Sequence, residues 1–554
     1  MQTMKFLSNT LFKSLLLATL LMGGVAAQAQ YRFGGLLMDR DGMMSNDMYT
    51  LSQTNFGFGT ARSMSMAGAF TSLGGDVASM GINPAGLGMY RSGDLSFSPM
   101  MAFNNATTDG ADAWGENSMS RFSIANFGAV FNLYESSRGS LVSFNVGLGY
   151  NRVADLNYSY GFTSQSAPST NPYRSINDAF VRQLGQGGVF PAADGSLDYS
   201  FGDSYYWGGM LAYNGYLLDV ETDEYGDYWT SANRIGSNAA VGHTAGVESR
   251  GYIGEYQLSG GLNFANKLYV GATIGIQSVR WERQIYYGED YIYSSTPVYS
   301  DGTPLSSPAE WMDYNQAVRI NGAGVNLKLG AIYRPFPSLR LGVALHTPTY
   351  YSLERTYQSY MASNFNTSGD TTPSLEDVGD NSWEFCSPTK LMFGASYSFG
   401  RFAVLSVDYE RDWYNGIRVK NIPAGFDLAK SDYRQEFKDN FKGSNIVRLG
   451  AEIKPIANFA LRAGYGYSDG ALRNEYSAYY NRPLTFRTVC YSAGAGVALG
   501  RATIDLAYQH LVQSQTAYML YYAMDEAGYL DTASPYYTTS LTRDYVILTL
   551  GYKF

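Results

Sequence analysis

The chain has 554 residues, a formal net charge of −9 and a mean hydropathy of −0.20. This length exceeds what one ordinary soluble core supports, and the acidic balance argues against nucleic acid as a partner. After the N-terminal leader the sequence contains no long uncharged apolar segment, which excludes a bundle of membrane-spanning helices.

The N-terminus has the pattern of a secretory signal peptide. Lys5 and Lys13 precede an apolar run from Leu15 to Met22, which is too short to span a bilayer. Ala27-Gln28-Ala29 then forms a small-residue cleavage site. We therefore expect residues 1–29 to be removed on export and the mature chain to begin at Gln30.

Residues 30–91 lack the alternation of the rest of the chain and are rich in small residues, methionine and glycine. Asp76 predicts the cap of a short helix, which Asn83-Pro84 would end. A compact segment of this kind can fill the lumen of a barrel, so we predict that it forms an N-terminal plug. Its apolar leading residues would either reach into a ligand pocket or anchor the plug; they are Phe33, Leu36 and Leu37.

From about residue 92 to residue 554, apolar and polar side chains alternate in successive stretches. In 447–454, for example, all charged residues fall on one face. An apolar face toward lipid and a polar face toward a lumen are what a transmembrane strand requires. In the weakest stretch, 121–133, the apolar phase shifts between Ile124 and Phe127, which predicts a bulge.

The connections between these stretches alternate in length. Short ones include 265–267 and 455–458. This parity is typical of outer-membrane barrels, which have tight periplasmic turns and long external loops, whereas a β-sandwich would not keep it. The predicted fold is therefore all-β: a transmembrane antiparallel β-barrel of about 14 strands over residues 92–554. The long connections are expected near 104–120, 164–250, 288–316, 351–388, 415–440, 469–483 and 512–540.

The last ten residues form a further strand of this kind. Val546, Leu548, Leu550, Tyr552 and Phe554 fall on one face, and mostly polar residues fall on the other. A terminal strand ending in Phe resembles the signal that the bacterial outer-membrane assembly machinery reads. We therefore expect the outer membrane of a Gram-negative bacterium as the location and this machinery as a partner during biogenesis.

The block from Ala61-Arg62 to Met66-Ala67-Gly68-Ala69, followed by Asn83-Pro84-Ala85-Gly86-Leu87, resembles the N-terminal signature of the FadL/TodX family. The stretches 327–350 and 447–452 are also similar to that family. Its members are outer-membrane transporters of long-chain fatty acids and other hydrophobic compounds. The resemblance covers nearly the whole mature chain and implies a barrel of about 14 strands closed by an N-terminal hatch.

The resemblance also implies a route for the ligand. A hydrophobe is caught on the external loops, moves to a pocket inside the barrel, and leaves sideways when the hatch shifts. Gly147 and Gly149 would form the lateral gate, because the family's third strand kinks inward; alternatively these glycines make room for the plug. The residues implied for the hatch motif are Arg62, Asn83, Pro84, Ala85 and Gly86.

The long 164–250 connection carries an unusually apolar segment. It is either the surface on which the ligand is captured or the small core of a folded loop. This loop and the 48 tyrosines depart from the family's fatty-acid carriers, so the ligand stays open between fatty-acid-like, aromatic and porphyrin-like molecules. The candidate capture residues are Tyr206, Trp207, Met210, Leu211, Tyr213 and Leu217.

The sequence predicts no catalytic, metal or cofactor site. Gly466-Tyr467-Ser468-Asp469-Gly470 matches G-x-S-x-G, but a barrel strand running into a loop is the wrong context for a nucleophile elbow. Cys386 and Cys490 lie far apart with no CxxC motif, and whether they pair stays open. The inward charges are expected to form ion pairs with one another and with the plug; they are Arg334, Arg340, Asp408, Glu410, Arg448, Glu452, Lys454, Arg462 and Asp505.

The function predicted from the sequence is passive uptake of hydrophobic compounds through an outer-membrane channel. The expected partners are hydrophobic small molecules and the outer-membrane lipids and lipopolysaccharide around the barrel, with no nucleic acid. Two alternatives remain at this point. A general diffusion porin would share the barrel but has no use for residues 30–91, and a barrel enzyme would need a Ser/His pair that the sequence does not place.

Overall fold

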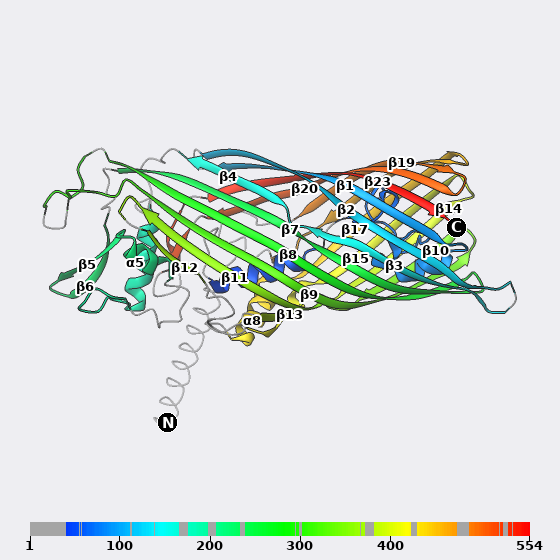
Figure 1. The fold of residues 1–554 in the computed structure, drawn as a ribbon, viewed down its shortest axis with the longest axis horizontal. Helices are drawn as coiled ribbons and strands as arrows, with labels where there is room; N and C mark the ends of the chain where they lie inside the picture. The colour runs from blue at the N-terminus through cyan, green and yellow to red at the C-terminus, as the bar shows by residue number, and fades with distance from the viewer. Residues whose placement is uncertain are drawn as a thin grey trace, which may run out of the picture.

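The alternating stretches form a closed antiparallel β-barrel of 14 strands (Figure 1). β1 (Asp94–Gly110) pairs with β2 (Ala113–Glu135) and closes the barrel by pairing with β23 (Tyr536–Lys553). The computed structural model describes residues 40–54, 56, 58–110, 113–137, 139–164, 175–197, 207–232, 239–293, 295–298, 302–365, 367–371, 382–422, 429–473, 487–519, 521–524, 530–534 and 536–554.

Strands that follow one another in sequence are neighbours in the wall, and several wall positions consist of two shorter strands in line. After β2 come β3 (Leu141–Asp155) with β4 (Tyr158–Ser164), β7 (Ala239–Phe264), β8 (Leu268–Tyr293) and β9 (Trp311–Phe336). Next are β10 (Leu339–His346) with β11 (Tyr350–Ser363), β14 (Lys390–Phe399) with β13 (Ser382–Cys386), and β15 (Ala403–Trp413) with β16 (Arg418–Asn421). The wall ends with β17 (Gly443–Ile456), β18 (Phe459–Ser468), β19 (Thr488–Leu499) and β20 (Ala502–Met519).

The polarity of the outward and inward faces of the long strands is exchanged partway along their length. On β8, Ile274 and Ile276 point outward and are about half exposed, while Thr273 points inward and is buried. Further along, Arg280 points outward and Trp281 is buried inside. About ten residues of outward apolar strand, tilted as in known barrels, span roughly 25 Å, which is the height of a lipid-facing belt. Beyond it the outer face is polar and the inner face is apolar.

Because the outer face of the strand ends is polar, parts of the strands were wrongly predicted to be loops. The expected loop at 104–120 is a regular hairpin, with pairs from Asn104–Met119 to Gly110–Ala113. The predicted bulge in the second strand is confirmed, because Ser98 pairs with Asn126 and Pro99 with Ile124, leaving Ala125 unpaired. The predicted short turns are present between β7 and β8 and between β17 and β18. The end of the barrel with short turns is called the turn end, and the opposite end the loop end.

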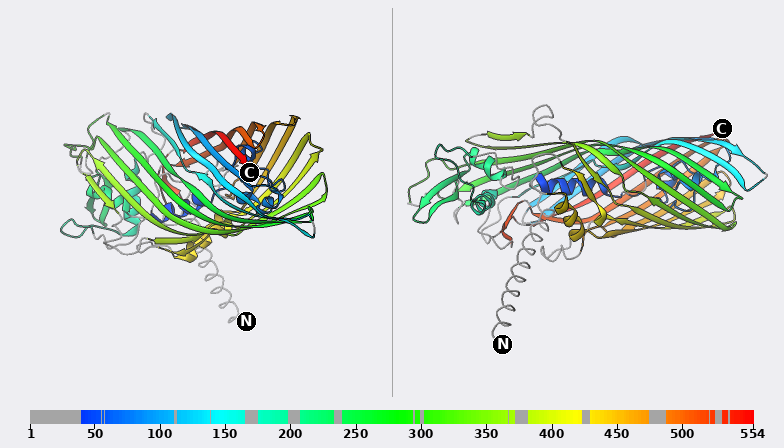
Figure 2. Two further views of the ribbon diagram at one scale, coloured as in Figure 1. Left: turned by 45° about the vertical axis from the view of Figure 1, so that its right-hand side comes forward. Right: turned by 90° about the horizontal axis from the view of Figure 1, so that it is seen from below.

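The described part of the plug lies inside the barrel, where the blue elements of Figure 2 are enclosed by strands. It contains α2 (Arg40–Ser52), α3 (Ala61–Met64), α4 (Ser79–Ile82) and the 3-10 helix η1 (Pro84–Met89). Thr60 caps α3 by accepting from the Ser63 amide, and Asn83 caps η1 by accepting from the Ala85 amide. The plug side chains are almost all buried between the strands.

At the loop end, α5 (Ile176–Gly187), α6 (Trp207–Asn214), β5 (Leu218–Asp223) and β6 (Gly226–Ser231) form a cap on the extended strands. Glu289 of β8 accepts from the Ile176 amide at 2.7 Å and from Tyr291 Oη at 2.8 Å, and so fixes the N-terminus of α5. None of the described helices is both long and apolar enough to cross a bilayer. Smaller elements are β12 (Thr367–Thr371), η3 (Tyr414–Gly416), α8 (Lys430–Asn440), β21 (Tyr522–Met524) and β22 (Leu530–Ala533).

Candidate functional site: a cavity between plug and wall

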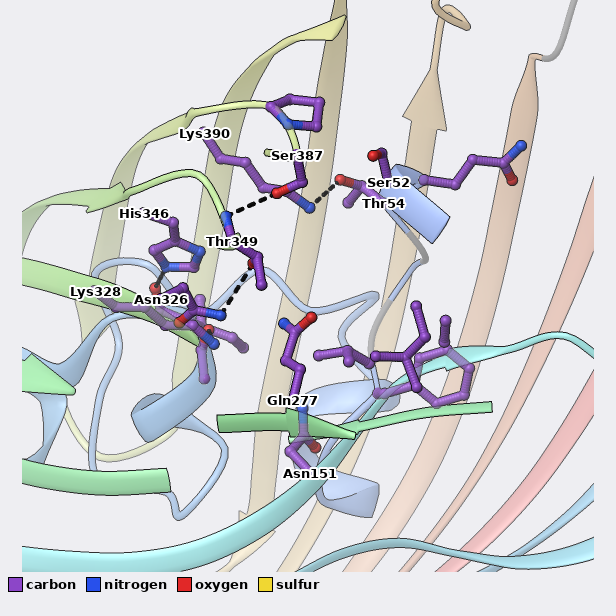
Figure 3. Close-up of a pocket in the computed structure, with 18 of the residues that line it drawn as sticks. Ser52, Thr54, Asn151, Gln277, Asn326, Lys328, His346, Thr349, Ser387 and Lys390 are labelled. Atoms are coloured by element: carbon purple, nitrogen blue, oxygen red, sulfur yellow. Dashed lines mark hydrogen bonds between the residues drawn. The ribbon is translucent and has the colours of Figure 1, made fainter. Parts of the chain in front are cut away.

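A cavity of about 140 Å³ lies between the plug and the wall (Figure 3). The end of α2 and the turn around Ile82 bound it from the plug side. The wall side is formed by residues of β3, β7, β8, β9, β10, β11, β14, β15 and β17 and of the segments that join β10 to β11 and β13 to β14. Its apolar lining includes Leu51, Ile82, Val153, Ile253, Tyr351 and Met392.

One buried carboxylate organises the polar part of the lining. Glu255 of β7 forms an ion pair with Lys328 of β9 and accepts from Gln257 at 2.7 Å, Gln277 at 2.8 Å and Asn326 at 3.0 Å. All of these side chains are buried. Because a buried charge is stable only when it is paired and hydrogen-bonded, the network holds one fixed arrangement of amides facing the cavity.

The plug is bonded to this network through its backbone. Lys328 Nζ donates to Gly81 O at 3.2 Å, and His346 Nε2 lies 2.9 Å from Ile82 O. On the other side of the cavity, Lys390 Nζ donates to Thr54 Oγ1 at 2.5 Å. Any movement of the plug therefore changes contacts that line the cavity.

Deeper in the lumen, Arg448 pairs with Glu410 at 2.5 Å, and both groups line the cavity. The cavity thus combines apolar side chains with cations, amides and hydroxyls. This lining suits an amphiphile better than a purely apolar or a purely polar molecule.

The sequence motif at 83–86 forms the seat of the plug on the wall. Asn83 is fully buried; its Nδ2 donates to Thr71 O at 2.6 Å, and its Oδ1 accepts from the Ala85 amide at 3.1 Å. Gly330 of β9 faces Asn83, and a Cβ atom at that position would overlap the Asn83 side chain. Pro84 and Ala85 pack in the same way over Gly271 of β8. These glycines let the plug approach the wall closely.

Gly86 and Arg62 complete the predicted motif. A Cβ atom on Gly86 would lie 2.6 Å from Ser79 Oγ, so the turn needs glycine there. Arg62 Nε lies 3.2 Å from Glu452 Oε2 of β17, and Arg62 Nη1 donates to Gly75 O at 3.2 Å. Glu452 also pairs with Arg462 at 2.7 Å. Arg62 therefore joins the plug to a charge network of the wall.

The predicted gate glycines lie against the plug. A Cβ atom on Gly147 would lie 2.6 Å from Met80 Sδ, and one on Gly149 would lie 2.5 Å from Met80 Cε. At both positions β3 is paired continuously with β2 and β7. This placement agrees with the alternative reading, in which the glycines make room for the plug. The lateral gate at these residues stays a prediction.

The predicted capture residues lie in the cap. Met210, Leu211 and Leu217 are buried in its core, which agrees with the folded-loop alternative. Trp207 Nε1 donates to Ser359 Oγ at 3.2 Å, and Tyr213 Oη donates to Gly195 O at 3.1 Å. The predictions for the signal peptide and for Tyr206, Phe33, Leu36 and Leu37 lie outside the described residues.

The sequence did not predict two buried ion pairs that share one carboxylate. Asp47 of α2 lies 3.2 Å from Arg283 and 3.2 Å from Arg355, in the apolar core beneath the cap. Ser45 of the same helix donates to Glu436 of α8 at 2.8 Å. No signal in the sequence could pair Asp47 with strands more than two hundred residues away. The inward charges of the wall, by contrast, were expected to pair, and Arg448–Glu410 and Arg462–Asp505 confirm it.

The G-x-S-x-G match has no catalytic surroundings. Ser468 is the last residue of β18, and its Oγ lies 3.2 Å from Ser444 Oγ. Within the described ranges, no cluster of His, Cys, Asp or Glu side chains could hold a metal ion. Cys386 and Cys490 are both free thiols.

Comparison with known proteins rests on structure alone. No family model matches the sequence, and no curated protein matches it. A FadL homologue from Pseudomonas aeruginosa superimposes with a TM-score of 0.50 at 11% identity, over 91% of this chain and 100% of that chain. The toluene transporter TodX from Pseudomonas putida gives a TM-score of 0.48 at 13% identity, over 91% and 100%. The chain therefore has the fold of the FadL homologue, as the resemblance implied.

Proposed function

We propose that the protein is an outer-membrane channel for the passive uptake of hydrophobic compounds, fatty-acid-like or aromatic. The observation that carries this proposal is the amphipathic cavity enclosed between a lumen-filling plug and a lipid-belted wall. A molecule bound there has the plug on one side and the wall on the other. Such a path lets an apolar solute pass a lipopolysaccharide layer that blocks its direct entry.

The plug argues against the alternative of a general diffusion porin. Met64, Met66, Phe70, Met80 and Leu87 are fully buried in the lumen of the described structure. An open porin keeps a water-filled lumen, whereas here apolar side chains occupy the barrel cross-section. A polar solute would therefore need the whole plug to leave, while a hydrophobe needs only a local shift.

The proposed route has three stages. The ligand is captured at the loop end, where the apolar residues of α6 become accessible when the cap loosens. It then binds in the cavity, with its polar group on the amides around Glu255 and its apolar part against Tyr351 and Met392. Release is lateral and follows a shift of the plug, since Lys328 and His346 link the plug backbone to the cavity lining.

The apolar belt and the two different ends of the barrel also support a location in the outer membrane. The apolar belt of roughly 25 Å matches the outer membrane, and the loop end faces outward. Lipids and lipopolysaccharide then surround the wall, and the assembly machinery reads the last strand during biogenesis. We infer no enzymatic activity, because Ser468 lacks the strand-turn-helix context of a nucleophile elbow.

The test measures selectivity in cells that express the full chain. Uptake of radiolabelled oleate and of toluene should rise over cells without the protein, while entry of a small sugar should not. Lys328→Met, which removes a cavity cation, should lower oleate uptake more than toluene uptake. Faster sugar entry with no gain for either hydrophobe would replace the proposal with a general porin.

A further inference from the structure

The outer face of the wall carries a groove of about 740 Å³ on the loop side of the apolar belt. The strands that form it are β2, β4, β7, β8, β9 and β11, which are neighbours in this order (Figure 1). We call it the outer groove; it is separate from the cavity beside the plug, which lies inside the wall. Outward side chains that line the outer groove include Trp114, Glu116, Gln284, Tyr286, Asn315 and Tyr360.

The cross-strand register arranges most of the lining in two neighbouring rows. In the first row each residue pairs with the next, and its members are Gly161, Gly246, Tyr286, Asn315 and Tyr360. The second row is built in the same way from Ser159, Glu248, Gln284, Ala317 and Gln358. A Cβ atom on Gly246 would meet only Tyr160 O, at 3.9 Å. The floor of the outer groove beside Tyr286 is therefore open space.

The outer groove has the chemistry of a saccharide-binding surface. Trp114, Tyr286 and Tyr360 are 66%, 38% and 43% exposed, so their rings are open to a ligand. A sugar ring has C–H faces that pack on aromatic rings and a rim of hydroxyl groups that bind amides and carboxylates. Asn315 and Glu116 supply an amide and a carboxylate in the same groove.

The same lining argues against an acyl chain or an apolar protein surface as the occupant. Among the outward residues of the outer groove that the structure describes, no aliphatic side chain is larger than that of Ala317. Interfaces between proteins have a more apolar core, and acyl chains need aliphatic surroundings. The outer groove therefore suits a polar ligand with flat faces.

Three arginines lie between the apolar belt and the outer groove. Arg280 of β8 is flanked at its diagonal cross-strand positions by Arg250 of β7 and Arg319 of β9. Arg250 forms an ion pair with Glu248, and Arg319 pairs with Glu282 at 3.4 Å. Arg280 points outward and forms no ion pair within the described residues. We call the three arginines the arginine cluster; guanidinium groups of this kind bind phosphate through paired hydrogen bonds.

The belt, the arginine cluster and the outer groove follow one another along β8. At the tilt of a barrel strand, Arg280 lies roughly 10 Å and Tyr286 roughly 25 Å above Ile276, which belongs to the belt. Gln284 in the groove donates to Glu282 at 3.0 Å, so the groove and the charged residues are continuous. Lipopolysaccharide has acyl chains, phosphates and sugars in the same order. A free glycan would use neither the belt nor the arginine cluster.

We propose that the outer groove binds the inner saccharides of lipopolysaccharide from the surrounding outer leaflet, while the arginine cluster binds the phosphates of its lipid anchor. This inference rests on the proposed location in the outer membrane. The acyl chains lie along the belt near Ile276. Tyr286 and Tyr360 pack against sugar rings, and Asn315 between them bonds to the hydroxyl groups.

The test compares three ligands on the purified full-length protein. Native mass spectrometry measures the bound fraction in lauryldimethylamine oxide, a detergent without a sugar head group. The ligands are rough lipopolysaccharide, which carries only the inner sugars, then lipid A, which lacks them, and maltoheptaose. Rough lipopolysaccharide should bind about tenfold more tightly than lipid A, and maltoheptaose should not bind. Equal binding of the first two would overturn the groove, and maltoheptaose binding as tight as that of rough lipopolysaccharide would assign it to free glycans instead.

A variant that fills the groove tests the position of the sugars. Gly246→Leu places a side chain in the open floor and should lower the affinity for rough lipopolysaccharide to that for lipid A. Gly260→Leu is the matched control, because Gly260 faces outward on the same strand within the belt, where a Cβ atom meets only Phe144 at 3.7 Å. If Gly246→Leu does not assemble, Tyr360→Ala removes one ring of the groove and should weaken the same binding. Unchanged affinity in assembled Gly246→Leu, or in Tyr360→Ala used in its place, would overturn the proposal.

A second variant tests the phosphate contact. Arg280→Met should weaken the binding of rough lipopolysaccharide and lipid A alike, since both carry the phosphates. Arg418→Met is the control, because Arg418 is an exposed arginine of β16, outside the cluster. Equal affinities of the two variants for lipid A would overturn the assignment of the phosphates.

Uptake of oleate and toluene by cells that carry the wild-type protein separates this inference from the proposed function. Uptake without any preference for rough lipopolysaccharide over lipid A would overturn the groove and leave the function standing. A lack of uptake of both hydrophobes would overturn the function. In that case a difference in lipopolysaccharide binding between Gly246→Leu and Gly260→Leu would still support the groove.

Discussion

Met80 of the plug occupies the space that a side chain at Gly147 would need. A Cβ atom there would lie 2.6 Å from Met80 Sδ and 2.7 Å from Leu87 Cδ2. Similar close approaches occur between Asn83 and Gly330 and between Thr71 and Gly342. The inner face of the wall therefore has glycine at several points where the plug approaches it most closely, and a larger side chain there would collide with the plug.

This fit predicts the effect of filling the space. Gly147→Val should displace Met80 and Leu87 and destabilise the seated plug by about 1–3 kcal/mol, as overpacking does. Ion conductance in planar bilayers should rise while the barrel still assembles. Gly260→Ala is the matched control, because Gly260 is on the same side of the barrel and a Cβ atom there meets only the edge of Phe144 at 3.7 Å. Equal conductance in both variants would contradict the prediction.

Asn83 predicts a second effect on the plug. Asn83→Ala removes the donor to Thr71 O and the acceptor for the Ala85 amide, which should cost about 1–3 kcal/mol of plug stability. Hydrogen exchange of 60–89 should become faster, with the strands unchanged. Asn83→Asp keeps the acceptor but sets a buried carboxylate against the Thr71, Ala331 and Val343 carbonyl oxygens, so its effect should be at least as large. Exchange rates that do not change in Asn83→Ala would show that the motif does not seat the plug.

Removing the plug should expose the barrel's own permeability. A barrel of this strand number is wide enough for solutes when nothing fills it. The intact protein should conduct ions poorly, and deletion of residues 31–88 should raise conductance sharply and abolish selective hydrophobe uptake. Single-channel recording checks the first effect and oleate uptake the second. Open-porin conductance of the full-length protein would refute the prediction.

The cap depends on Glu289. Glu289→Gln weakens the bonds to the Ile176 amide and to Tyr291, and hydrogen bonds to a charged group are worth about 1.5–3 kcal/mol each. Limited proteolysis should then cut near α5 faster, while heat resistance of the barrel on detergent gels stays the same. Glu248→Gln is the control, since Glu248 is on the outer face of the neighbouring strand with its side chain 38% exposed. Equal protease resistance of the two variants would contradict this role.

A substitution at Ser468 tests whether the G-x-S-x-G match contributes to ester hydrolysis. Ser468→Ala should leave any residual hydrolysis of p-nitrophenyl esters by the purified protein unchanged, because Ser468 Oγ lies within hydrogen-bonding distance of Ser444 Oγ, which is not a general base. Loss of a measured activity in this variant would assign a catalytic function to the barrel.

The sequence predicted the barrel because alternation is a local property. Strands such as 447–454 carry an apolar face and a charged face, and lipid and lumen are the only surroundings that suit both. Even the bulge at Ala125 was readable, since an extra residue shifts the phase of the pattern. The length of the strands was not readable, because their outer face becomes polar beyond residue 277 of β8 and then looks like loop.

The site was predicted only in part, for a related reason. Asn83-Pro84-Ala85-Gly86 is a local motif, so its place in the plug could be inferred. The Glu255 network joins residues from β7, β8 and β9 that are up to 73 positions apart, and no single stretch reveals it.

The polarity inversion on β8 also sets how far the protein stands above the lipid. The strand continues from residue 278 to residue 293 with a water-compatible outer face, and at the tilt of a barrel strand this adds roughly 40 Å of height. The strands thus continue beyond the apolar belt as a tube that ends at the cap, and the barrel does not open at the level of the belt. A solute that enters through the mouth of this tube first contacts the protein roughly 40 Å beyond the apolar belt.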